Sequence, residues 1–180
     1  MQKKVVDQIT ITVVFLFFLS LLRFKIDLSL IPLWLGGLLG AVILETDYLF
    51  QVFLVQPELP VAQDVRKIMR EFGVIKGIKT VFERTGEIKN LTFHTIFFQV
   101  IFYVFALFIT TSSGSVFGQA LVLTALLSLL TKQVKEVREI GELDKGWFYR
   151  LNVSLTSDRQ KIYVAVMVIF FILLTTFALK

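Results

Sequence analysis

The chain contains no cysteine, one histidine and three prolines among its 180 residues. Without cysteine, it can form neither a disulfide framework nor a thiolate metal site. A single histidine also makes a poor zinc site, because three protein ligands are usual. Cysteine-based chemistry is therefore excluded, and zinc chemistry is disfavoured.

Apolar residues are abundant instead. They make up 56% of the chain, with 19 phenylalanines and a mean hydropathy of +0.76. A soluble domain of this size cannot hide so much apolar surface, whereas lipid solvates it directly. The net charge of +5 fits a membrane protein whose basic loops attract anionic lipid headgroups. Because no nucleic-acid recognition motif accompanies the charge, we expect no nucleic-acid partner.

Five apolar stretches predict transmembrane helices. They cover residues 5–24, 28–55, 93–111, 116–131 and 161–179. The first also fits a signal peptide, but no small-x-small cleavage site follows it, which favours a retained helix. We therefore predict an all-α integral membrane protein, a single membrane domain over 1–180 built as a bundle of about five transmembrane helices.

Two long segments connect these stretches. Residues 57–92 carry an amphipathic pattern, which we interpret as cytoplasmic helices lying at the membrane interface under the bundle, because no separate core is evident for them. The alternative is a solvated helical hairpin. Residues 132–160 form a cytoplasmic loop that begins as a charged extension of the fourth helix. Trp147, Phe148 and Tyr149 in this loop are typical of an interfacial aromatic belt.

The basic residues predict an orientation. Sixteen lysines and arginines fall at the N-terminus and in the two long segments, whereas three fall on the other side. By the positive-inside rule the N-terminus and both long segments are cytoplasmic, and the C-terminus is outside. The chain is thus expected to be a multi-pass protein of the cell (inner or plasma) membrane, with the lipid bilayer as its partner.

A polar site is predicted at the cytoplasmic level of this layout, where charges need a specific reason. Glu45 and Asp47 are the acidic residues of the second stretch, His94 begins the third, and Lys132 ends the fourth. Asp47 falls within about 20° of a stripe of small residues at 100° per residue, whereas Glu45 faces the opposite side unless the helix bends. The stripe, expected to pack against neighbouring helices, consists of Gly36, Gly37, Gly40 and Ala41.

Two interpretations of this site stay open. Glu45, Asp47 and His94 are candidate catalytic residues and candidate ligands of a divalent metal in a hydrolytic centre. Alternatively, the residues form a structural polar cluster in which Asp47 pairs with Lys132 or with a loop arginine, and no cofactor is bound.

Three short segments resemble the membrane-bound metal-dependent hydrolase family, including its LexA-regulated inner-membrane members. Residues 40–48, GAVILETDY, resemble that family's G-x-x-x-P-D-x-D-H. Residues 89–95, KNLTFHT, resemble H-R-x-x-T-H-S, and residues 128–132, SLLTK, stand where the family has H-x-x-x-D. The resemblance covers roughly residues 30–135 and implies a polytopic fold and a divalent metal.

The departures from these motifs argue against retained metal chemistry. Asp47 and His94 are unchanged, and Glu45 replaces an aspartate. Leu44 replaces the proline that bends the helix between the two carboxylates. A histidine, a histidine, an arginine, a histidine and an aspartate of the family's motifs are replaced here by Tyr48, Lys89, Asn90, Ser128 and Lys132, in that order. A lysine at a ligand position repels a cation.

We therefore expect a membrane protein of structural or interaction type, a remote and non-catalytic relative of these hydrolases. The alternative is a metal-dependent membrane hydrolase acting on a lipid-like or envelope substrate. A transporter is disfavoured, because few polar groups lie at mid-membrane depth and no inverted repeat is evident.

Overall fold

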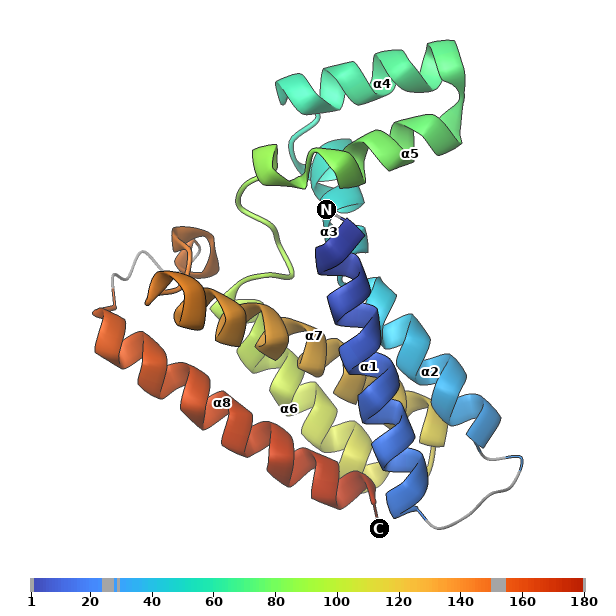
Figure 1. Cartoon of the computed structure of the whole chain (residues 1–180), viewed down its shortest axis with the longest axis vertical. Helices are drawn as coiled ribbons and strands as arrows, with labels where there is room; N and C mark the ends of the chain where they lie inside the picture. The colour runs from blue at the N-terminus through green and yellow to red at the C-terminus, as the bar shows by residue number, and fades with distance from the viewer. Residues whose placement is uncertain (1, 24–27, 29, 150–154, 180) are drawn as a thin grey trace.

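The computed structural model describes residues 2–23, 28, 30–149 and 155–179. Within these residues the regular structure is all-helical, without a strand (Figure 1). Phe24, the predicted end of the first span, and the cations Lys25, Arg150 and Lys180 lie outside the described residues. The α-helices are α1 (Gln2–Leu22), α2 (Leu30–Ile43), α3 (Thr46–Phe50), α4 (Pro60–Phe72), α5 (Val74–Glu83), α6 (Ile96–Ser112), α7 (Val116–Ile140) and α8 (Ser157–Ala178).

Helix α7 is the centre of the bundle and contacts α1, α2, α6 and α8 (Figure 1). Its apolar stretch is 56% buried inside the protein, against 22% for that of α8. Leu123 and Leu126 of α7 form one core cluster with Tyr103 of α6 and Leu174 of α8. Many side chains on the outer faces of these helices are exposed and apolar.

The outward faces suggest membrane association. Phe17 of α1, Leu35 of α2, Phe108 of α6 and Phe170 of α8 are all more than half exposed. Helices α7 and α8 are long and apolar enough to cross a membrane. A third candidate span is formed by α2 together with its bent continuation to Val55, and the shorter helices α1 and α6 are also apolar.

The small-residue stripe of α2 lies against α7. A Cβ atom on Gly36 would collide with the backbone carbonyl of Phe117, and one on Gly40 with that of Leu121. Gly37 instead faces the side chain of Leu16 on α1. Ala41 completes the buried face of α2. Close backbone approach of this kind is the usual role of small residues between membrane helices.

The segment 28–55, expected to be one helix, is divided in the structure. Helix α2 ends at Ile43, α3 follows at a bend of 42°, and a π-helical turn, η1 (Gln51–Val55), completes the segment. Helix α7 continues to Ile140, as expected for a segment that begins as a charged extension of the fourth helix.

Residues 57–92 form a helical hairpin of α4 and α5 with a core of its own. Val61 and Val65 of α4 pack with Val81 of α5 and with Val52 of η1. We favoured interfacial helices because no core was evident for this segment. The structure supplies that core, since the apolar faces of the two helices cover each other.

Candidate functional site

The bend between α2 and α3 brings Glu45 and Asp47 to one site. The backbone N–H groups of Glu45, Asp47 and Tyr48 each donate to the carbonyl three residues earlier, which tightens the chain at this point. The Thr46 hydroxyl donates to the Ile43 carbonyl at 2.6 Å, a side-chain bond that often accompanies helix bending. The helix therefore bends here without the proline that the resembling family carries.

Asp47 is fully buried, and its carboxylate accepts three hydrogen bonds. Oδ1 accepts from the Thr92 N–H at 3.2 Å, and Oδ2 accepts from the Phe93 N–H at 2.6 Å. The third donor is His94, whose Nδ1 lies 3.0 Å from Oδ2. A buried carboxylate is tolerated only when it is bonded in this way. Asp47 thus fixes the chain segment that leads into α6.

His94 connects Asp47 to a lysine. A carboxylate only accepts hydrogen bonds, so Nδ1 carries the ring proton and Nε2 is an acceptor. The Lys132 ammonium of α7 lies 2.8 Å from Nε2 and 2.6 Å from Glu45 Oε1. These four side chains, Glu45, Lys132, His94 and Asp47, form a continuous chain that we call the polar cluster. Lys132 thus pairs with Glu45 and not directly with Asp47 as expected, and His94 lies between Asp47 and Lys132.

Two aromatic rings enclose His94. The Tyr48 ring centroid lies 5.9 Å away, and that of Trp147 lies 6.1 Å away. Trp147 is buried, and its indole N–H donates to Glu136 Oε2 at 2.8 Å. The expectation that Trp147 and Phe148 form an interfacial belt is wrong for these two residues, because both are buried; Tyr149 is exposed. The apolar character of Trp147 and Phe148 does not indicate whether lipid or protein contacts these side chains.

The other residues of the resembling motifs lie differently. Lys89 is exposed, and Asn90 occupies the left-handed backbone region at a φ of 58°. Ser128 is buried one helical turn before Lys132, and its hydroxyl has no hydrogen-bond partner among the described residues. Of the residues in the resembling motifs, the polar cluster contains Glu45, Asp47, His94 and Lys132. Lys89 and Asn90 do not belong to it.

Burial lowers the pKa of His94, which lies in the segment before α6; the Asp47 carboxylate opposes this shift and the Lys132 ammonium adds to it. A lowered pKa means that the unfolded chain takes up a proton more readily than the folded one. The contribution of His94 to the free energy of unfolding is then fully present above the ordinary histidine pKa of about 6.5. It is lost as the pH falls through the pKa of the folded protein.

We expect the thermal midpoint of the detergent-solubilised chain to fall as the pH is lowered below about 6.5. Thermal scans across this range measure the effect. The His94→Gln variant serves as the comparison, because it retains a polar side chain but cannot titrate there. If both proteins lose stability in parallel, His94 is not the titrating group.

A second buried polar group joins α6, α7 and α8. The side-chain amides of Gln99 and Gln133 exchange two hydrogen bonds, at 3.0 and 2.7 Å, and both residues are fully buried. The Tyr163 hydroxyl donates to Gln99 Oε1 at 2.7 Å. The sequence indicates few polar groups at mid-membrane depth, and it does not indicate that Gln99 has these partners. The available signals were Gln99 inside the third apolar stretch and Gln133 just beyond the end of the fourth.

At the opposite end of the bundle, Arg23 binds α7 and α8. Its guanidinium donates to Gln119 Oε1 at 2.7 Å and to the Ala178 carbonyl at 2.8 Å. The polar side chains inside the bundle thus connect helices to one another.

A positive charge already lies between two of the candidate metal ligands, because Lys132 contacts both Glu45 and His94. Within the part of the chain that the structure describes, no three His, Asp or Glu side chains are arranged to hold one. Glu45 and His94 both direct their free ligand atoms at the Lys132 ammonium, a fixed positive charge. An additional cation at this place would be repelled.

Comparisons of the chain with protein-family models, with curated proteins and with solved structures gave no match.

Proposed function

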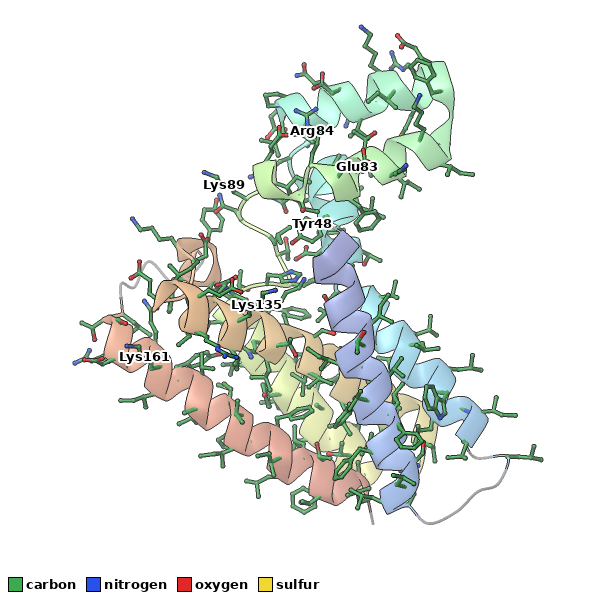
Figure 2. All side chains as sticks on the ribbon, viewed as in Figure 1. Tyr48, Glu83, Arg84, Lys89, Lys135 and Lys161 are labelled. Atoms are coloured by element: carbon green, nitrogen blue, oxygen red, sulfur yellow. The ribbon has the colours of Figure 1, made fainter. Side chains whose placement is uncertain are left out.

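We propose that the chain is a polytopic membrane protein of structural or interaction type. In this proposal α1, the bent segment from α2 to η1, α6, α7 and α8 are its five spans. The α4–α5 hairpin and the polar cluster then lie on the cytoplasmic side. The apolar outward faces of the helices support this arrangement. So does the location of Arg84, Lys89, Lys135 and Lys161, which all lie at the end of the bundle that carries the hairpin (Figure 2).

The contact of Lys132 with both Glu45 and His94 carries the proposal. This ammonium supplies the positive charge that a metal supplies in a hydrolase of the resembling family. Lys132 therefore balances the charge of Glu45, and the Asp47 carboxylate is stabilised by its three N–H donors. The polar cluster acts as a clamp that holds α3, the segment before α6, and α7 in fixed positions. A remote relationship to those hydrolases, with their metal chemistry lost, accounts for the shared motifs.

The test is a titration of the purified chain with Mn²⁺ and with Zn²⁺. We expect the wild-type protein to show no saturable binding in the micromolar range and no increase in thermal midpoint. The Lys132→Asp variant is expected to gain metal-dependent stabilisation, because a carboxylate next to Glu45 and His94 replaces the repelling charge.

Lys135→Asp is the matched control. It makes the same charge change on the same helix, at a side chain that is 41% exposed. This variant should not respond to metal. Saturable binding by the wild type, abolished in Glu45→Gln, would instead favour the alternative function, a metal-dependent hydrolase of a lipid-like or envelope substrate.

A further inference from the structure

The tip of the α4–α5 hairpin is apolar, although the hairpin buries its own core. Three large apolar side chains flank the turn at Gly73, where φ is +90°. Their exposed fractions are 59% for Phe72, 57% for Val74 and 86% for Ile75. The turn lies at the end of the hairpin farthest from the helices of the bundle (Figure 1). These side chains therefore cannot be covered by the rest of the described chain.

Charge is distributed unequally along the hairpin. The half nearest the tip, residues 66–79, contains five basic side chains and one acidic side chain, Glu71. The base, residues 57–65 and 80–88, contains four acidic side chains and one basic side chain, Arg84. Arg84 binds Asp64 at 2.7 Å and Glu87 at 2.6 Å, so the base neutralises part of its own charge. The positive charge is concentrated around the exposed apolar side chains.

One cation lies directly beside an apolar side chain of the tip. The Lys76 ammonium is 3.8 Å from the centroid of the Phe72 ring. Apolar side chains that enter the acyl boundary while neighbouring cations meet headgroup phosphates are the usual means of interfacial binding. The flexible stems of lysine and arginine allow both contacts at once.

We propose that this tip inserts into an anionic lipid leaflet, with Phe72, Val74 and Ile75 below the headgroups and the surrounding cations among the phosphates. The inference rests on the proposed function, because it needs the bundle to be in the same membrane. Three apolar side chains form too small a patch for a stable protein interface, which needs about 800 Å² on each partner. A bilayer needs no such area, because the spans would tether the hairpin to the same membrane.

The absence of cysteine makes the proposal directly measurable. Ile75→Cys and Gly86→Cys each introduce one site for a nitroxide label into the full-length chain. Ile75 is highly exposed, and a Cβ atom at Gly86, in the base of the hairpin, meets no neighbour. Neither substitution removes a core contact. The chain is reconstituted in nanodiscs of phosphatidylcholine alone or with phosphatidylglycerol.

We expect the label at Ile75 to be several-fold more accessible to oxygen than to a water-soluble nickel complex in anionic nanodiscs. This preference should be much smaller in neutral nanodiscs. The label at Gly86 should report an aqueous environment in both. An aqueous label at Ile75 in anionic nanodiscs would overturn the proposal. Dipolar broadening that grows with the ratio of protein to lipid would also overturn it, because a second copy of the chain would then cover the tip.

The role of charge is tested by the double variant Arg70→Gln and Lys76→Gln. It should reduce the preference of the Ile75 label to the value in neutral lipid. Arg138→Gln with Lys161→Gln removes the same charge from exposed sites outside the hairpin and should leave the preference unchanged. Equal insertion by all three proteins would contradict an anionic partner. Metal binding by Glu45 and His94 would overturn the proposed function without moving this label, so the two failures are distinguishable.

Discussion

Replacing Asp47 with alanine is expected to lower the free energy of unfolding by about 3–5 kcal/mol, the cost of removing one partner from a buried charged network. The substitution leaves the Thr92 and Phe93 N–H groups and His94 Nδ1 without their acceptor. Each buried donor without a partner costs about 1–3 kcal/mol. Unfolding of the detergent-solubilised chain by increasing sodium dodecyl sulfate measures the loss.

Asp64→Ala is the comparison for this prediction. Asp64 is also a carboxylate with a short ionic contact, to Arg84, but its side chain is 55% exposed. Water replaces such a contact, so a loss of about 1 kcal/mol or less is expected. If both variants lose the same free energy of unfolding, the buried contacts of Asp47 stabilise the chain no more than the exposed contact of Asp64 does.

The second large effect is expected for Gly40→Ala. Alanine is the better helix former by about 1 kcal/mol, so propensity alone predicts stabilisation. The added Cβ, however, meets the Leu121 carbonyl and the Thr124 hydroxyl of α7. Backbone atoms cannot rotate away, and overpacking of this kind costs about 1–3 kcal/mol. We expect the collision to outweigh propensity and the variant to unfold at a lower detergent concentration.

Gly114→Ala adds the same methyl group in the turn between α6 and α7, where a Cβ atom meets no neighbour. This variant should match the wild type or exceed it slightly. A neutral result for Gly40→Ala would show that α2 and α7 separate easily, and the close approach of the two helices would then not support the bundle.

The positions of charged residues along the apolar stretches indicated the members of the polar cluster, but not which of them contact one another. Charges at the ends of apolar stretches are few, so Glu45, Asp47, His94 and Lys132 were recognisable as one group. The bend at residues 44–45 was not, because no glycine or proline marks it. The bend is accompanied by a local bond from the Thr46 hydroxyl, and it is held by bonds from Thr92 and Phe93 to Asp47, which connect residues 45 or more positions apart. Local sequence patterns carry no information about such contacts.

The amphipathic segment 57–92 shows a second limit of prediction from the sequence. Its periodicity predicted helices with an apolar face, and α4 and α5 have such faces. Periodicity does not specify whether lipid or another helix covers an apolar face. Here Val61 and Val65 meet Val81, and η1 contributes Val52. The same ambiguity applies to Trp147, which packs beside His94 instead of at a membrane surface.

The chain enters and leaves the hairpin at two fixed points. On one side, Val52 of η1 belongs to the hairpin core and continues from α3. On the other side, the returning segment is bonded to Asp47, also on α3. The chain on both sides of the hairpin is therefore held by the continuous α3–η1 segment. A tilt of α2 and α3 relative to α7 is expected to move the hairpin with it and to displace the Gly73 turn at its far end.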